Sequence, residues 1–428
     1  MVVASVTIWL RRVGARLRIW SQRGSTVLRE SSRQRVGLVA AGIAATLAVV
    51  LVVTMMGGSD GDNGTAVAAG SEKQAAAATI DIAPEHDSDD VRPDKPIKVT
   101  AAGGTLTDVT VQGKGDPVTG SYSDDKRGWK SSGTLEPRRT YTVTATAKNP
   151  DGKVTTTTSR FKTLTPRNGV EIIDVTPMKG ETVGVGMPII VTFSGPVHNK
   201  DKVERALEVT SEHDDAGAWR WLSDQQVAFR TEEYWEPNQR VTFKGHLSGV
   251  RAAKDTYGTE DFSRKFKIGD SHISTINVKK HTMTVKENGE TERRFGISAG
   301  KATTYAYTTA SGVHLTMDKG NPVRMKSPPH IKKGDPEYYD LDVYWAVRIS
   351  NSGEYVHAMA STTWAQGRQN VSHGCVNASP ENGEWFYKYS YRGDPVKVTG
   401  TSRDLEWNNG YGYWQMSFKK WKKGSALD

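Results

Sequence analysis

Apolar and polar residues alternate with a period of two over much of this chain, which is typical of half-buried β-strands. Residues 141–147 (YTVTATA) alternate strictly, and residues 154–161 follow them after the turn sequence NPDG at 149–152. Two such runs joined by a turn predict a β-hairpin. With the neighbouring Val-, Ile- and Thr-rich runs around Trp129, the pattern predicts a β-sandwich over residues 79–165.

A second series of short apolar runs occupies residues 166–268 and predicts another all-β sandwich. Turns rich in Gly, Pro and Asp separate its runs at 172–177, 189–193, 206–210, 226–230, 240–244 and 262–268. Neither sandwich contains a cluster of reactive side chains. Their histidines are scattered, and we expect them to be surface or core residues rather than metal ligands: His86, His198, His213 and His246.

A third region, residues 269–399, carries the strongest hairpin signal of the chain. The dipeptide Asn288-Gly289 lies between the strand-like runs 276–285 and 291–298. Further strand-like runs lie at 303–309, 343–349, 355–360 and 395–398. The pattern predicts a β-rich domain.

One main helix is expected in this third domain, over residues 382–391 after an N-terminal cap. Ser379 can cap the first turn and Pro380 fits the first helical position. One side of the helix is apolar, with Trp385, Phe386 and Tyr389. The fold class predicted for the whole chain is therefore mainly β.

The final segment, residues 400–428, has few branched aliphatic residues but six large aromatic ones. These are Trp407, Tyr411, Tyr413, Trp414, Phe418 and Trp421. Each such ring can bury about 150–250 Å². We expect the rings to pack on a domain that is already folded, chiefly the third, together with the second sandwich beside it; stacking on sugars of a glycan is the alternative.

A single segment is apolar enough to cross a membrane. Residues 36–56 contain no charged side chain, and at about 1.5 Å per residue they span roughly 31 Å as a helix. Arginines crowd residues 1–35, which predicts a cytoplasmic N-terminus, an anchor that stays in the cell membrane and an extracytoplasmic remainder. A flexible linker follows at 57–78. The alternative is a signal peptide cleaved at the Ala-Val-Ala sequence of 66–68.

Charge and composition exclude several classes of protein. With 36% hydrophobic and 25% charged residues, the 428-residue chain is too apolar to be disordered and long enough for about three domains. Its net charge is +9, but residues 1–35 hold eight arginines against one glutamate, which leaves +2 for the rest. A nucleic-acid-binding surface is therefore not expected on the folded part.

Cys375 is the only cysteine of the chain, so it cannot form an intramolecular disulfide. It lies in the sequence SHGCVN at 372–377, and a useful thiol nucleophile there needs a base. His357 ends a strand-like run and can approach across the loop. Gly374 permits a backbone turn that directs its own amide and that of Cys375 toward one point, as in an oxyanion hole.

Two other interpretations of this motif remain open. Cys375 could be a buried structural residue beside a histidine that is there by chance. A zinc site would use His330, His357, His373 and Cys375, but their spacing is not that of ordinary zinc ligands.

The combination of His357, fourteen intervening residues and SHGCVN resembles the active-site signature of the L,D-transpeptidases, the YkuD-type catalytic domain of bacterial cell-wall enzymes. The order of anchor, two immunoglobulin-like domains, catalytic domain and aromatic extension resembles the actinobacterial members. The resemblance implies that Cys375 is the nucleophile and His357 its general base. It also implies that the main-chain carbonyl of Ala358, where some relatives carry serine, orients the imidazole.

The resemblance extends to the residues around this pair. His373 and Gly374 join Cys375 in the segment of the oxyanion hole, while Ser372 and Asn377 hold the loop. Two weaker matches concern substrate binding: Tyr339 on a flap over the substrate, and Met317 lining the same cleft. A core role for Met317 is an equal alternative.

The activity implied is that of a peptidoglycan L,D-transpeptidase without metal or organic cofactor. Its partners would be donor and acceptor stem peptides of peptidoglycan, the cytoplasmic membrane through the N-terminal helix, and carbapenems as covalent inhibitors. Cys375 would form a thioester with the third residue of a tetrapeptide stem and pass it to a diamino-acid amine. Water as the acceptor would make the protein an L,D-carboxypeptidase, and a non-catalytic wall-binding scaffold is the third possibility.

Overall fold

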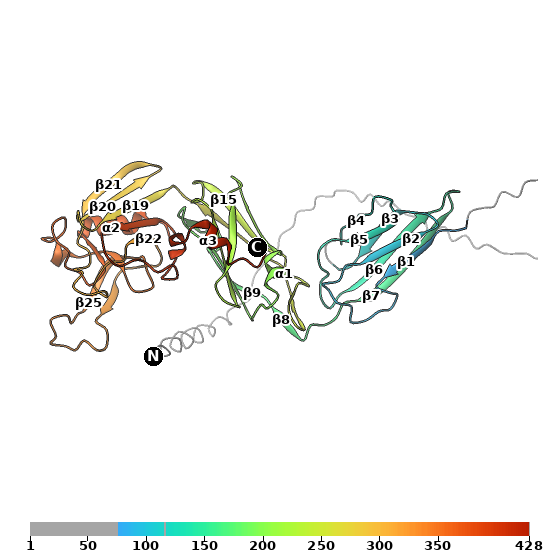
Figure 1. The fold of residues 1–428 in the computed structure, drawn as a ribbon, viewed down its shortest axis with the longest axis horizontal. Coiled ribbons are helices and arrows are strands. Elements are labelled where there is room, and N and C mark those ends of the chain that lie inside the picture. Colours follow the sequence, from blue (N-terminus) through green and yellow to red (C-terminus); the bar gives the residue numbers. More distant parts are fainter. Residues whose placement is uncertain (1–75, 115–116, 428) are drawn as a thin grey trace, which may run out of the picture. The chain divides into compact units, whose positions relative to one another are not determined.

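The computed structural model describes residues 76–114 and 117–427 (Figure 1). Their sheets fall within residues 79–162, 168–268 and 272–399. These ranges lie inside the domain boundaries predicted from the sequence, and the boundaries stay predictions. None of the described helices is both long and apolar enough to cross a membrane. The predicted anchor at 36–56 and its cleavage alternative lie outside the described residues, as does most of the linker.

The first sandwich consists of two antiparallel sheets (Figure 1). One sheet has the order β1 (Thr79–Ala83), β2 (Lys98–Ala102), β5 (Gly128–Ser131), β4 (Gly120–Tyr122). The other has the order β3 (Thr105–Gln112), β6 (Thr140–Lys148), β7 (Val154–Lys162). The predicted hairpin is confirmed, because β6 and β7 pair from Thr140↔Lys162 to Lys148↔Val154. Trp129 is buried in the core between the sheets.

The second sandwich also has two main sheets, as predicted. Their orders are β10 (Thr182–Val183), β18 (Phe262–Ile268), β15 (Gln239–Gly245), β12 (Leu207–Ser211), and β13 (Gly217–Trp221), β14 (Gln226–Thr231), β11 (Ile189–Phe193), β9 (Ile172–Thr176). A small third sheet joins β16 (Arg251–Ala253), β17 (Thr256–Gly258) and β8 (Asn168–Val170), and a short helix, α1, spans Lys200–Glu204. Trp219, Trp235 and Phe243 are buried in its core.

The third region contains two five-stranded sheets and one α-helix of ten residues. The first sheet has the order β21 (Glu290–Gly296), β20 (Thr282–Glu287), β19 (His272–Asn277), β28 (Pro395–Thr399), β22 (Gly312–Leu315). The second has the order β23 (Lys319–Gly320), β25 (Asp340–Arg348), β26 (Tyr355–Ala358), β27 (Val376–Ala378), with β24 (Val323–Lys326) paired to β25. Helix α2 (Pro380–Tyr389) packs on the second sheet and buries Phe386.

The local signals of this region are mostly confirmed. Asn288-Gly289 forms the turn between β20 and β21, both residues with positive φ. Ser379 caps α2, accepting a hydrogen bond from the Asn382 amide at 3.3 Å. The helix ends two residues before the predicted limit, at Tyr389.

Two strand predictions are wrong. The run 276–285 is two strands, because the chain turns after Asn277 and His281 adopts a positive φ. The run 303–309 contains no strand. The Tyr307 amide bonds to the Thr304 carbonyl, and the Thr308 hydroxyl donates to the same carbonyl. Short-range bonds of Ser and Thr side chains compete with the ladder of a sheet.

The aromatic tail packs chiefly on the second sandwich. The third domain, which was expected to be the main packing surface, contributes less. Trp421 is fully buried in a cluster with Ala228 of β14, and its indole donates to the Ala218 carbonyl at 2.8 Å. The guanidinium of Arg230 lies 4.6 Å from the ring of Trp414 and 5.3 Å from that of Trp421. The tail packs there because the second sandwich presents the guanidinium of Arg230, on which aromatic rings can stack, beside the apolar residue Ala228 of β14. The tail contains a 3₁₀ turn (Gly412–Gln415) and helix α3 (Phe418–Lys422).

Candidate active site

Two parallel strands bring the predicted histidine and cysteine to the same place. Strands β26 and β27 pair in the register Val356↔Val376 and His357↔Asn377. Cys375 directly precedes β27, so it lies level with the start of β26. Both His357 and Cys375 line one cleft of about 640 Å³. Parallel pairing of segments distant in sequence is a tertiary feature that spacing alone does not fix.

His357 is buried and held by one main-chain contact. Its Nδ1 lies 3.0 Å from the carbonyl oxygen of Ala358, so Nδ1 carries the hydrogen and donates, and Nε2 is left as an acceptor. Burial lowers the pKa of His357, and the bond to Ala358 opposes this only in part. The imidazole is therefore neutral at pH 7 and able to accept a proton.

The thiol of Cys375 is protonated at rest. Burial raises its pKa to about 12; the main chain of Tyr355 opposes the shift and the charge of Glu354 adds to it. The sulfur lies 3.6 Å from the carbonyl oxygen of Gly353. A thiolate in such surroundings forms only when a base removes the proton during attack.

Hydrogen bonds to neighbouring hydroxyls fix the loop before the nucleophile. Ser372 Oγ donates to the Cys375 carbonyl at 2.5 Å and accepts from the Gly374 amide at 3.1 Å. Thr309 Oγ1 donates to the Gly374 carbonyl at 2.7 Å. Gly374 has a φ of 131°, which favours glycine.

The two amides predicted to point at one spot differ in their contacts. The Gly374 amide donates to Ser372 Oγ, whereas the Cys375 amide has no hydrogen-bond partner in the described part of the chain. Asn377 is buried at the other end of the motif, and its side chain donates to Thr362 Oγ1 at 3.2 Å. Ser372 and Asn377 thus hold the loop from both sides.

Of the two predicted substrate-binding residues, the cleft contains one. Tyr339 lines it, and the pKa of its hydroxyl is raised by burial first and by the neighbouring Cys375 second. Met317 does not line the cleft. It is 8% exposed, its amide donates to the Arg348 carbonyl, and its sulfur lies against Gly410. Met317 is a core residue because the tail covers it, so the core alternative was correct.

His373 does not face the thiol. Its Nε2 lies 2.6 Å from Glu337 Oε2, and its ring packs between those of Tyr307 and Tyr339. His330, another residue of the zinc alternative, is exposed. Among residues 76–114 and 117–427, no three His, Cys, Asp or Glu side chains are grouped closely enough to hold a metal ion.

Two charged residues in the wall of the cleft were not predicted from the sequence. Glu354 is 3% exposed and accepts the Ala310 amide at 2.8 Å. Arg403, from the segment after β28, lies 3.9 Å from Glu354, and both line the cleft. Glu337, which contacts His373, was likewise missed. Each lies outside the motif and reaches the site only through the fold.

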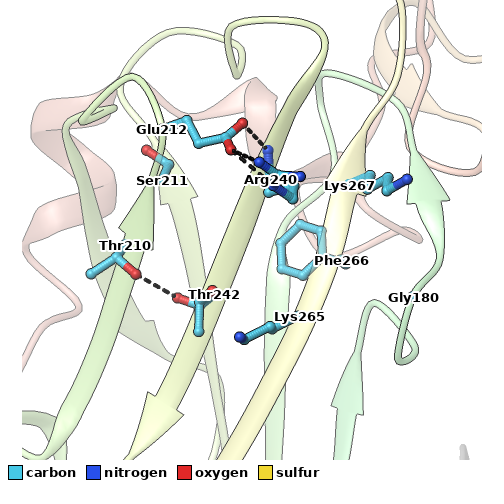
Figure 2. A pocket seen from close by; sticks show the side chains of 9 residues that line it. All are labelled: Gly180, Thr210, Ser211, Glu212, Arg240, Thr242, Lys265, Phe266 and Lys267. Carbon is cyan, nitrogen blue, oxygen red and sulfur yellow. Dashed lines mark hydrogen bonds and ion pairs between the residues drawn. The ribbon is translucent and has the colours of Figure 1, made fainter.

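A second recess lies on the second sandwich, over strands β12, β15 and β18 (Figure 2). Arg240 in this recess is already paired with Glu212, 2.8 Å away. The other polar side chains around it are Thr210, Ser211, Thr242, Lys265 and Lys267. They include neither a cysteine nor a histidine, so the recess contains no nucleophile–base pair.

Comparison with known proteins identifies two kinds of domain in the chain. Residues 271–398 match the model of the L,D-transpeptidase catalytic domain (YkuD), and residues 88–251 match that of a bacterial Ig domain. The chain is 34% identical over 336 residues to L,D-transpeptidase 2 of Mycobacterium tuberculosis, which covers 78% of this chain and 81% of the relative. It is 33% identical over 354 residues to L,D-transpeptidase 5 of the same species, covering 80% and 76% respectively.

A solved structure of an LD transpeptidase in complex with imipenem is 34% identical to the chain, with a TM-score of 0.46; the match covers 55% of this chain and all of that one. The chain thus combines immunoglobulin-like sandwiches with a YkuD-type catalytic domain that follows them. By its sequence similarity the chain belongs to the L,D-transpeptidases.

Proposed function

We propose that this protein is a peptidoglycan L,D-transpeptidase that works through a thioester on Cys375. The observation that carries the proposal is a single cleft lined by the Cys375 thiol and by His357, whose Nδ1 is fixed by the Ala358 carbonyl. A neutral imidazole beside a protonated thiol is the pair that acyl transfer needs, because the base can take the thiol proton as the sulfur attacks.

The reaction then proceeds in two steps. As Cys375 attacks the carbonyl of the third residue of a tetrapeptide stem, His357 Nε2 takes the thiol proton. The C–N bond to the terminal D-alanine breaks, and the proton passes to the leaving amine. A side-chain amine of a second stem then attacks the thioester carbonyl and gives up a proton to His357. The C–S bond breaks, and His357 returns the proton to the sulfur. The Cys375 amide supports the proposed oxyanion, and the Gly374 amide can join it only by leaving Ser372.

The same chemistry extends to β-lactam inhibitors. A carbapenem ring presents a strained acyl group to the thiol, and a related structure contains imipenem. We expect imipenem to acylate Cys375 and to add its own mass to the chain.

We also propose that residues 36–56 anchor the protein with its catalytic domain outside the cell membrane. Fractionation and N-terminal sequencing test this, because a mature terminus near Ala69 would mean cleavage instead.

The decisive experiment incubates the protein with tetrapeptide stems and separates the products. We expect cross-linked dimers and free D-alanine from the wild type, and neither from Cys375→Ala at more than about a thousandth of the wild-type rate. Circular dichroism of the variant should remain unchanged. Tripeptides without dimers would show that water is the acceptor. Dimers formed by Cys375→Ala would refute covalent catalysis.

A further inference from the structure

The loop between β24 and β25, residues 327–339, forms a flap beside the cleft. Two hydrogen bonds join the ends of the flap. The Tyr339 amide donates to Ser327 Oγ at 2.6 Å, and the Ser327 amide donates to the Tyr339 carbonyl at 2.9 Å. Most residues between these two are exposed. Pro328 and Tyr339 line the cleft, so the position of the flap sets the width of its entrance.

Glu337 ties this flap to the wall that carries the nucleophile. Its Oε2 accepts hydrogen bonds from Lys301 Nζ at 2.5 Å and from His373 Nε2 at 2.6 Å. Lys301 lies in the segment after β21, and His373 lies two residues before Cys375. Within the described chain, no other side chain of the flap forms a hydrogen bond or an ion pair outside residues 327–339.

Both hydrogen bonds that Glu337 accepts are charge-assisted, because the acceptor is a carboxylate. The bond from Lys301, and after it the bond from His373, lowers the pKa of Glu337 below its usual 4.5. The carboxylate is therefore ionised throughout the neutral range. Hydrogen bonds with an ionised partner are stronger than those between neutral groups.

Glu337 also fixes the ring of His373. The ring centroid lies 4.7 Å from that of Tyr307, edge to face, and 4.9 Å from that of Tyr339. Tyr339 belongs to the flap, whereas Tyr307 belongs to the segment between β21 and β22, and both line the cleft. One carboxylate thus sets where the flap, the imidazole and both tyrosines lie.

We propose that Glu337 is a positioning residue. Its contacts with Lys301 and His373, together called the latch, hold the flap in place. They thereby keep the cleft over Cys375 in the conformation that binds a stem peptide. This rests on the proposed function, because the substrate is the one proposed above. Glu337 touches no reacting atom. Its loss should therefore weaken substrate binding and leave the chemical step largely intact.

The test compares Glu337→Ala and Glu337→Gln with Asp335→Ala. Asp335 is the matched control, since its carboxylate lies in the same flap and accepts a hydrogen bond from the Lys332 amide. Glu337→Ala loses the partly exposed ion pair with Lys301 and the hydrogen bond from His373. We therefore expect KM for the tetrapeptide donor to rise about threefold to tenfold, with kcat within about twofold. Glu337→Gln keeps an acceptor and should recover part of the loss.

Hydrogen exchange of residues 327–339 gives a second readout that does not depend on turnover. Exchange should become faster throughout residues 327–339 in Glu337→Ala, whereas in Asp335→Ala the change should be confined to the Lys332 amide, which loses its acceptor. A Glu337→Ala variant with the KM and the exchange of the control would overturn the proposal. If the wild type itself forms no thioester on Cys375 by intact mass, the proposed function fails, while the exchange result still decides whether the latch exists.

Discussion

At the scale of single residues, the site consists of two groups that burial drives toward their neutral forms. Burial raises the pKa of Cys375 to about 12 and lowers that of His357. Because both shifts favour the uncharged state, the resting pair is thiol and imidazole, not thiolate and imidazolium. Charges therefore separate only when the sulfur attacks and the substrate carbonyl receives the electrons.

This predicts how the thiol responds to pH. A raised pKa means that the thiolate fraction grows continuously as pH rises from 7 toward 12. The rate of alkylation of Cys375 by iodoacetamide should therefore rise about tenfold per pH unit between pH 7 and pH 9. Intact mass spectrometry follows the rate, with Cys375→Ala as the blank. A rate that is already maximal and flat at pH 6 to 7 would indicate a preformed ion pair.

At the scale of elements, helix α2 supports the base. Gly383 lies on the face of α2 that meets β26, and a Cβ at this position would come within 2.7 Å of the Ala358 amide nitrogen. Ala358 is the residue whose carbonyl orients His357. The close approach of helix to strand therefore needs a residue without a side chain, and it fixes the backbone that holds the imidazole.

Substitution of Gly383 by alanine should test this contact. Alanine favours the helix, but the added methyl must push β26 away, and overpacking of this kind costs about 1–3 kcal/mol. We expect a lower free energy of unfolding in urea and a kcat reduced by at least about tenfold, because the imidazole moves. Glu384→Ala is the control, since Glu384 pairs only with exposed Lys388 on the same helix. Equal activities of the two variants would contradict the account.

At the scale of the whole molecule, the tail joins the second sandwich to the catalytic region. Trp421 and Met416 pack with Ala228 of β14, while Gln415 donates to the Val313 carbonyl of β22 at 3.1 Å. Arg392, beside β28, pairs with Glu181 of the second sandwich through bonds of 2.5 and 2.8 Å. The cation of Arg230 is covered by tail aromatics, and burial lowers its pKa to about 10.

Trp421→Ala should separate stability from catalysis. Removing a fully buried indole costs about 3–5 kcal/mol, so we expect a clearly lower Tm by calorimetry. At a temperature where the variant is folded, its kcat should equal that of the wild type, since Trp421 does not line the cleft. Deletion of residues 401–428 is a poorer test, because it also removes Arg403 from the cleft. An unchanged Tm together with loss of binding to isolated cell walls would favour the glycan alternative.

The sequence by itself determined the features that depend on neighbouring residues. Turn geometry at 149–152 and at Asn288-Gly289 follows from residues that tolerate positive φ, and the cap at Ser379 follows from a hydroxyl beside the unpaired amides of a first helical turn. The SHGCVN motif with His357 identified the nucleophile and base as candidates through its spacing. All of these are local or nearly local.

Only the tertiary structure decided which distant residues share the cleft. Parallel pairing of β26 with β27 places His357 beside the nucleophile segment, and the flap brings Glu337 to His373. No local preference encodes either contact, since both depend on how sheets and loops pack. For Met317 the sequence left the cleft and the core as equal alternatives, and the structure shows it buried, with its sulfur against Gly410. The physical reason is the same throughout: short-range geometry is written in adjacent residues, whereas burial and charge pairing depend on the whole fold.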